Sequence, residues 1–329
     1  GGVSPFPRLY PSTAAVATAR LADERTLVRL LIIAALLAFS PALGLAADDT
    51  VRLEQVAGTI EITIGGEKFA TYHYEGFEKP FMEDLRGPGG VIVTRSLKKE
   101  AVTDHPHHKG LWASVDEVNE NKHWMEGQPI RVESVEILKA EGDPASFRIS
   151  NTWLGNDEKP VLKEDTTVHV FADRVVSYDM KLSPAGDEPV TFGDTKEGFF
   201  AIRVRDELRE KGGTGKIVNS NGAKGESEAW GQTSPWVDYS GSVEGKPVGV
   251  AIFDHPSNFR PSRYHVRAYG LFAVSPFGES SYTNGKNDAR PFTLEKGDTL
   301  RLRYAAFIHA GDAGSADVAG RYAAYAKAK

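Results

Sequence analysis

The sequence predicts an all-β protein, a large antiparallel β-sandwich of the supersandwich kind with a short C-terminal helix. Alternating apolar and polar residues recur at short spacing between residues 51 and 310, and glycine, proline, asparagine and aspartate separate the alternating runs. Helical periodicity is almost absent before residue 315. Many short strands joined by turns, with few helices, are typical of two packed antiparallel sheets.

The first strand pair is the clearest element. Residues 59–64 read TIEITI and residues 68–74 read KFATYHY, with Gly65 and Gly66 before the second run. Two glycines supply the positive φ angles that a tight hairpin turn needs. Further strands are expected at residues 91–95, 130–138, 146–154, 166–171, 174–182, 199–204, 248–253, 265–274 and 299–308. The Ala-rich residues 315–329, which end in lysines, predict the one helix.

The first 46 residues are expected to lie outside this domain. After Arg29 come an apolar run at 30–38, the breaker Pro41 and small residues up to Ala46, which is the order of a secretory signal peptide. The apolar run is about half of the roughly 20 residues that a spanning helix needs. We therefore expect a translation artefact or disordered stretch at 1–27, a signal peptide at 28–46 and a single β-sandwich domain at 47–329. The protein would be periplasmic or secreted, with no membrane insertion after removal of the signal.

Residues 210–232 are rich in Gly, Ser, Asn and Lys, so we expect a long exposed loop there. This loop is either a lid over a site or a disordered insertion.

Composition excludes several classes of function. The chain has no cysteine, which rules out thiol nucleophiles, Cys-type zinc sites and iron–sulfur clusters. The formal net charge is −6, and the basic residues are interspersed, which argues against nucleic acid as a partner. A small-molecule or glycan ligand fits this composition better. Nothing in the sequence fixes the oligomeric state.

The most chemically loaded segment is DHPHHKG at residues 104–110, which we call the histidine loop. If it is extended, His105 and His107 face one way and His108 faces the other. Imidazole is suited to proton transfer near neutral pH, and all three are candidate catalytic residues. His105 and His107 could instead ligate a divalent metal, the one cofactor considered, with Glu197, His255 or His309 as a further ligand.

A second constellation follows the strand expected at 248–253. It contains His255 and His265, two further candidate catalytic residues, and Asn258, Arg260 and Arg267, three candidate substrate-binding residues. The arginines could hold a hydroxyl-rich or carboxylate ligand with their fork geometry. An interstrand network of ion pairs would give the same pattern.

A third set lies in two regions that flank apolar strands. Glu197 precedes the strand expected at 199–204 and is a candidate general base. Aromatic rings near the histidine loop could stack on a sugar, although tryptophan is more often a core residue in sandwiches. The candidate substrate-binding residues of this region are Arg95, Lys109, Trp112, Trp124 and Glu126.

The sequence resembles the PmoA-related family, also known as DUF6807, of exported bacterial proteins. The resemblance rests on the sequence segments RGPGG at 86–90, DHPHHKGLW at 104–112, KEG at 196–198, WVDYSG at 236–241 and VAIFDHPSN at 250–258, with RAYG at 267–270. Members often have arginine where this chain has Lys109. The family label, a methane oxygenase subunit, requires several membrane-spanning segments that residues 47–329 lack. The strand pattern also resembles that of galactose-mutarotase-like proteins. This resemblance implies that the protein binds a sugar in an open cleft.

Three hypotheses remain open at this point. The first is an exported carbohydrate-active enzyme, a hydrolase, lyase or epimerase with His and Glu as acid and base. The second is a non-catalytic sugar-binding or envelope module. The third is a metal-dependent enzyme.

Overall fold

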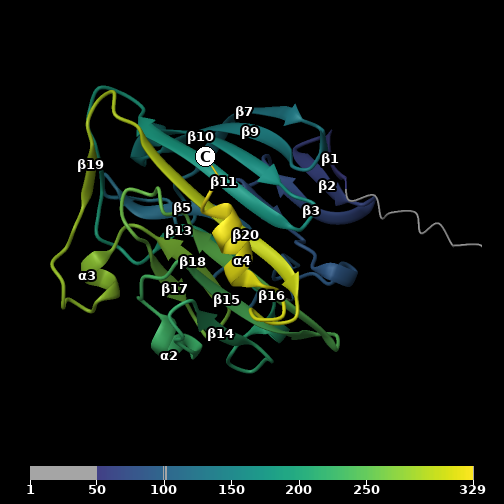
Figure 1. Cartoon of the computed structure of the whole chain (residues 1–329). Helices are drawn as coiled ribbons and strands as arrows, with labels where there is room; N and C mark the ends of the chain where they lie inside the picture. The colour runs from purple at the N-terminus through teal and green to yellow at the C-terminus, as the bar shows by residue number, and fades with distance from the viewer. Residues whose placement is uncertain (1–49, 99, 101, 329) are drawn as a thin grey trace, which may run out of the picture. The chain divides into compact units, whose positions relative to one another are not determined.

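The computed structural model describes residues 50–98, 100 and 102–328, and it confirms the all-β prediction. The predicted signal peptide and the stretch before it lie outside the described residues. The strands form two antiparallel sheets, one of 12 strands and one of eight (Figure 1). Within the described part of the chain, no helix is long and apolar enough to cross a membrane.

The 12-stranded sheet has the order β17-β18-β13-β5-β4-β3-β2-β1-β8, and β12, β19 and β6 pair off this path near β5. Its strands are β1 (Val51–Val56), β2 (Thr59–Ile64), β3 (Glu67–His73), β4 (Phe81–Glu83), β5 (Leu111–Val118), β6 (Asn121–Lys122), β8 (Glu141–Gly142), β12 (Val190–Phe192), β13 (Gly198–Arg203), β17 (Arg263–Val266), β18 (Leu271–Ser275) and β19 (Phe292–Leu294).

The eight-stranded sheet has the order β14-β15-β16-β20-β11-β10-β9-β7. Its strands are β7 (Ile130–Lys139), β9 (Ala145–Leu154), β10 (Pro160–Val170), β11 (Val175–Pro184), β14 (Lys216–Asn219), β15 (Trp236–Val243), β16 (Lys246–Asp254) and β20 (Leu300–Ala310).

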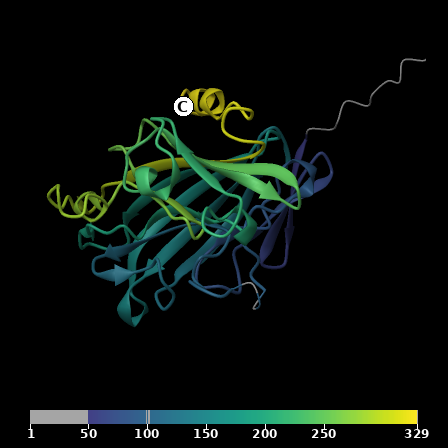
Figure 2. The ribbon, with the colours of Figure 1, turned by 90° about the horizontal axis from the view of Figure 1, so that it is seen from below.

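Short helices complete the described chain. They are α2 (Gly225–Ala229), α3 (Glu279–Tyr282), α4 (Val318–Tyr325) and the 3-10 turns η1 (Pro88–Gly90), η2 (Asn156–Glu158) and η3 (Asp206–Leu208). The predicted C-terminal helix is therefore present but shorter, because Asp317 caps it by accepting a hydrogen bond from the backbone N–H of Gly320. Val318 and Tyr322 of α4 pack on Phe253 of the eight-stranded sheet, on the face that points away from the other sheet (Figure 2).

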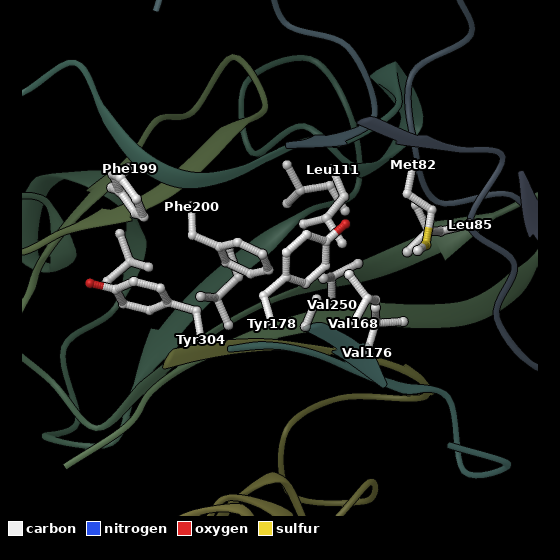
Figure 3. Close-up of a cluster of buried hydrophobic side chains, with 14 of the residues drawn as sticks. Met82, Leu85, Leu111, Val168, Val176, Tyr178, Phe199, Phe200, Val250 and Tyr304 are labelled. Carbon is white, nitrogen blue, oxygen red and sulfur yellow. The ribbon is translucent and has the colours of Figure 1, made fainter. Parts of the chain in front are cut away.

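The core lies between the two sheets. Phe200 of the 12-stranded sheet stacks on Tyr304 of the other sheet, with ring centroids 5.7 Å apart, and lies edge-on to Tyr178 at 5.1 Å (Figure 3). All three side chains are buried. Aromatic contacts of this kind stabilise a core beyond the area that they remove from water.

The predicted hairpin is confirmed as β2 and β3. Gly65 and Gly66 have φ angles of 60° and 78°, which residues with a Cβ rarely adopt. Thr59 pairs with His73 at the open end, and the register shifts between Ile62 and Thr63, as at a β-bulge.

Three predicted elements differ from the structure. Residues 91–95 form only isolated bridges, Arg86 with Ile92 and Thr94 with Val204, and no regular strand. The strand expected at 265–274 is divided into β17 and β18 by a turn at 267–270, where Gly270 has a φ of 97°. Residues 210–232 contain β14 and α2 and are therefore not a structureless loop.

Strand β13 is buried on both faces. Phe200 and Ile202 point into the core, whereas Ala201 and Arg203 point to the outer face of the 12-stranded sheet and are covered by loops. A strand covered on both sides reads as a nearly continuous apolar run, as GFFAIR does. The loops that cover its outer face include the histidine loop.

Truncation of Phe200 tests this description of the core. We expect F200A to lower the free energy of unfolding by about 3–5 kcal/mol, because it removes a buried ring between two tyrosines. Urea unfolding followed by tryptophan fluorescence measures the loss. The matched substitution L138A, at a side chain that is 39% exposed, should stay within about 0.5 kcal/mol of wild type. Equal losses in both variants would contradict this assignment of the core.

Candidate functional site

The floor of the candidate site is the outer face of the 12-stranded sheet. Trp112 of β5, Ala201 of β13 and Ala273 of β18 lie side by side across three strands, because Trp112 pairs with Ala201 and Ala201 with Ala273. Trp112 and Trp124 are each 1% exposed and pack together at 5.1 Å. Both tryptophans therefore belong to a covered floor, and neither presents a free ring face of the kind expected for a sugar platform.

The histidine loop folds as a turn above this floor. His105 has a φ of 40°, and the backbone N–H of His108 donates to the carbonyl oxygen of His105 at 3.0 Å. The expected extended geometry is therefore wrong. The turn brings all three imidazoles together, with ring centroids 4.4 to 5.8 Å apart.

Arg95 holds the loop in this conformation. Its guanidinium is 2% exposed and donates to the carbonyl oxygens of Asp104, His105 and His108 at 2.9 to 3.0 Å, and to the carboxylate of Asp104 at 2.7 Å. The side chain expected to bind substrate is thus committed to the loop. The structure makes Arg95 a positioning residue.

Arg203 at the end of β13 completes this arrangement. It donates to the same Oδ1 of Asp104 at 2.7 Å, and its Nη1 lies 3.3 Å from Nδ1 of His108. Burial alone would raise the pKa of Asp104, but the charges of Arg203 and Arg95 hold the pKa of that carboxyl below its usual range. Asp104 therefore stays ionised and ties the loop to the sheet.

Four rings form a continuous stack from the surface to the floor. Tyr269 stacks on His105 at 5.0 Å, His105 on His108 at 4.8 Å and His108 on Trp112 at 5.4 Å. The guanidinium of Arg203 also lies over the Tyr269 ring, 5.0 Å from its centroid. His105 is the most exposed imidazole of the three, with 42% of its side chain accessible.

Burial keeps the other two imidazoles of the loop neutral. Desolvation, followed by the charges of Lys79 and His105, lowers the pKa of His107 to about 4. Burial and the neighbouring cations also lower the pKa of His108. At neutral pH the half-buried His107 is therefore an uncharged ring that can accept or donate a hydrogen bond.

A buried lysine fixes the other wall. Nζ of Lys79 donates to the carbonyl oxygens of His123, Trp124 and Met125 at 2.7, 2.6 and 3.1 Å. Burial and the charge of Lys109 lower the pKa of Lys79 to about 7. The three carbonyl acceptors nevertheless match the three N–H donors of the protonated ammonium group. Lys79 thus pins the backbone around Trp124 beside the histidine loop.

Lys109 and Glu126 form an ion pair across the same wall. Nζ of Lys109 donates to Oε1 of Glu126, which joins the histidine loop to the loop after β6. Both residues were predicted to bind substrate. In this structure each has the other as its partner.

The opposite side of the site is built around Glu197 and His265. Glu197 lies directly before β13. Burial raises the pKa values of Tyr269, Asp116 and Tyr282, and the negative charge of Glu197 adds to each rise. His265 of β17 points to the same outer face and lies 3.0 Å from the carbonyl oxygen of Lys196 through Nδ1. Burial lowers the pKa of His265 to about 3.

Arg267 connects this side to the ring stack. Its guanidinium lies 5.7 Å from the Tyr269 ring centroid, and its Nε lies 2.9 Å from Oε1 of Glu226 on α2. Glu226 also accepts a hydrogen bond from the backbone N–H of Ala268 at 2.6 Å. Helix α2, within the predicted lid region, therefore contributes a side chain to the site.

Two open hollows flank this assembly. The first has a volume of about 570 Å³ and is lined by Glu117, Asp194, Thr195, Lys196, Glu226, Ser227, Trp230, Arg267, Ser281 and Asn284. The second has a volume of about 820 Å³ and is lined by Gly76, Phe77, Glu78, Leu97, Val102, Pro106, Lys109, Glu126 and Pro129. We call them the α2 hollow and the Phe77 hollow.

Three predicted site residues lie elsewhere or have other partners. His255 packs edge-on to Tyr325 of α4, on the eight-stranded sheet. The amide of Asn258 donates to the carboxylate of Asp254 and to the carbonyl oxygen of Arg303. Arg260 donates to the carbonyl oxygen of Arg290. The structure does not bring His255 or Asn258 to the histidine loop, because the chain after β16 turns toward α4.

The expected metal ligands are also separated. His105 and His107 share the loop, but His309 pairs with Asp238 on the eight-stranded sheet at 2.7 Å, and His255 lies near α4. Among residues 50–98, 100 and 102–328, no group of three or more His, Cys, Asp or Glu side chains is arranged to hold a metal ion.

Sequence reasoning missed four residues of the site: Lys79, Asp116, Arg203 and Tyr269. Arg203 ends an apolar strand and Lys79 precedes one. A charged residue beside a buried apolar run is rarely buried without a role, and this pattern could have identified both residues. Asp116 has the period-2 spacing from Trp112 that places both on the outer face. Tyr269 gave a weaker signal, an aromatic ring at the tip of a turn.

A family model described as "Family of unknown function (DUF6807)" matches residues 59–323. A search of curated proteins finds no match.

Several solved structures are similar to the chain in fold. A GalM/aldose epimerase homologue from C. elegans is 9% identical with a TM-score of 0.39, over 80% of this chain and 99% of that one. A galactose 1-epimerase from Lactobacillus acidophilus is 10% identical with a TM-score of 0.38, over 80% and 98%. A GH36 alpha-galactosidase from Geobacillus stearothermophilus is 9% identical with a TM-score of 0.43, over 75% of this chain and 40% of that one. The chain thus spans about two fifths of the galactosidase.

Replacement of Arg95 tests its positioning role. We expect R95K to release the histidine loop, because one ammonium cannot reach the four acceptors that the planar guanidinium joins. A buried carbonyl oxygen of the loop left without its donor should lower the free energy of unfolding by about 1–3 kcal/mol. Hydrogen exchange at the amides of residues 104–110 should accelerate more than exchange in β13. Unchanged exchange in the loop would contradict the assignment.

Replacement of His265 tests its burial in the neutral form. Between pH 4 and pH 6 the unfolded chain binds a proton at this residue and the folded chain does not, so stability falls as pH falls toward the lowered pKa. We expect H265N to make the slope of unfolding free energy against pH shallower by up to about 1.4 kcal/mol per pH unit. The control Y282F loses a hydrogen bond to the same carbonyl of Lys196 without changing this slope. Parallel slopes for H265N and wild type would contradict the prediction.

Proposed function

The chain belongs to the DUF6807 family, whose function is unknown, and we propose that it is a carbohydrate-active enzyme. In this proposal His105 and Glu197 are the proton-transfer groups. The observation that carries the proposal is the geometry of His105, an accessible imidazole whose orientation is fixed on both ring faces and at one nitrogen.

The fixed orientation of His105 has three causes. Tyr269 and His108 cover its two faces with interplanar angles of 2° and 7°. Nδ1 lies 3.4 Å from Oδ1 of Asp104. Because 42% of the side chain is accessible while both faces and Nδ1 have neighbours, we infer that the edge with Nε2 is open to a ligand. A carboxylate at one nitrogen of an imidazole selects the tautomer and directs the other nitrogen to the reaction.

The backbone of His105 supports the same interpretation. Its φ of 40° is uncommon for a residue with a side chain. Such conformations persist where the surroundings over-determine them, and they cluster at functional sites. Here the surroundings are the four hydrogen bonds of Arg95.

Glu197 supplies the second group. It lies on the same face, 29% of its side chain is accessible, and its Oε1 is 3.2 Å from Nζ of Lys196. Hydrolases, lyases and epimerases that act on sugars need one group to accept a proton and another to return one. In the proposed reaction the carboxylate of Glu197 accepts a proton from the substrate, Nε2 of a protonated His105 returns one, and the uncharged His107 hydrogen-bonds a hydroxyl.

The surrounding surface suits a polyhydroxyl substrate. Flat aromatic rings and charged groups that are already paired offer stacking and hydrogen bonds without a free charge that would need a counter-ion. The hollows fall within the volumes usual for small-molecule sites.

The test of the function is a substitution at His105. Wild-type protein is incubated with a panel of hexoses, pentoses and linear oligosaccharides, and product is followed by NMR. We expect H105Q to lower the turnover of the substrate found by about 10²- to 10⁴-fold, because glutamine keeps a polar side chain but cannot transfer a proton.

The matched control is H169Q, at a half-buried histidine of β10 in the other sheet. It should turn over substrate like wild type. Tight binding of a sugar without any product would favour a binding module instead. Equal turnover in H105Q and wild type would refute the role of His105.

A further inference from the structure

Each of the two hollows is lined by an aromatic side chain and by an ion pair. In the Phe77 hollow, an accessible aromatic ring lies near the ion pair of Lys109 and Glu126. In the α2 hollow, Trp230 lies near the ion pair of Arg267 and Glu226. A single site for one sugar would need only one such platform.

The histidine loop is connected to both hollows. Its residues Pro106 and Lys109 line the Phe77 hollow. Its residue His105 stacks on Tyr269, whose ring is also next to Arg267 of the α2 hollow. His105 is therefore adjacent to a lining residue of the Phe77 hollow, Pro106, and is joined through Tyr269 to a lining residue of the α2 hollow, Arg267.

Phe77 is held as a rigid platform. Its ring is edge-on to His73 at 5.5 Å and to Phe81 at 4.9 Å, yet 46% of the residue is exposed. Large apolar side chains with this exposure are few in the described chain. An aromatic ring fixed by its neighbours and open to water binds a flat apolar surface at little cost in side-chain entropy.

The basic side chains that line both hollows are neutralised within the protein, and the linings also contain the carboxylates of Glu78 and Glu117. Each basic side chain that lines the hollows has a carboxylate partner: Lys109 has Glu126, Arg267 has Glu226 and Lys196 has Glu197. The carboxylate of Asp194 accepts hydrogen bonds from the backbone N–H groups of Ser280 and Ser281. An anionic ligand would meet these carboxylates and would have to break one of the ion pairs, whereas a neutral ligand with hydroxyl groups can share them.

We propose that the substrate is a neutral, linear oligosaccharide that runs from the Phe77 hollow past His105 into the α2 hollow, with sugar units on both sides of the reacting unit. This inference rests on the proposed function and adds the class of substrate. The phenyl ring of Phe77 and the indole ring of Trp230 would each stack on a sugar ring at one end of the chain.

The experiment measures dissociation constants by calorimetry for linear oligomers of glucose, galactose, mannose and xylose with one to six units. Oligogalacturonates of the same lengths provide the charged comparison. We expect the dissociation constant of the best neutral series to fall by at least about tenfold from one unit to six, since each filled platform adds a stacking contact.

Variants at the two ends separate length recognition from chemistry. F77A removes the platform of one hollow, and S227L places a larger side chain in the other without removing a contact of the core. We expect each to raise the dissociation constant of the hexamer by about 5- to 20-fold, and to reduce the ratio of monomer to hexamer affinity. The control L138A, on the other sheet, should leave both affinities unchanged.

The outcomes distinguish the two proposals. A monomer that binds as tightly as the hexamer, with no effect of F77A or S227L, overturns the inference while a turnover loss in H105Q still supports the enzyme. Tighter binding of oligogalacturonates than of neutral oligomers also overturns it. Absence of binding and turnover for every saccharide overturns both proposals together.

Discussion

The carboxylate of Asp104, shared by Arg95 and Arg203, is the interaction on which the candidate site depends. Two guanidinium groups, 2% and 0% exposed, meet at one oxygen atom. Two buried cations and one anion leave an excess positive charge, which is costly unless further acceptors are present. The carbonyl oxygens of Asp104, His105 and His108 are those acceptors, and the turn of the histidine loop brings all three to the guanidinium of Arg95.

The conformation of the loop then determines which imidazole is available for chemistry. Because Arg95 binds the carbonyl oxygens of both His105 and His108, the loop closes into a turn and stacks the two rings. His108 becomes the lower ring, 1% exposed, and His105 the upper one. Strand alternation would have separated these two rings, whereas the arginine joins them.

The sequence predicted the fold well where burial on one face imposes alternation. Strands β2 and β11 follow this rule, and the predicted boundaries of β2, β7, β9 and β11 agree with the structure to within a few residues. The prediction was less successful near the site. Residues 91–95 read VIVTR, which has the β-branched content of a strand, but they lie beside the end of β13 and pair only through bridges.

The composition of residues 104–110 identified the histidine loop as a candidate site. It did not predict that the loop forms a turn. Three imidazoles, an aspartate and a lysine in seven residues are rare enough to mark a site. The partners that shape it, Arg95 and Arg203, lie about ten and a hundred residues away, and no local pattern places them there. For the same reason His255 looked equivalent to His105, since the two segments contain the same Asp-His-Pro sequence.

The two Asp-His-Pro segments show what separates a structural histidine from a candidate catalytic one in this fold. The outer face of the eight-stranded sheet is covered by α4, so His255 is 4% exposed and packs on Tyr325. His309 on the same sheet is 3% exposed and bonds to Asp238. The outer face of the 12-stranded sheet is covered by loops, which leave gaps. His105 stands at such a gap with its orientation fixed, and a fixed but accessible imidazole is what proton transfer requires.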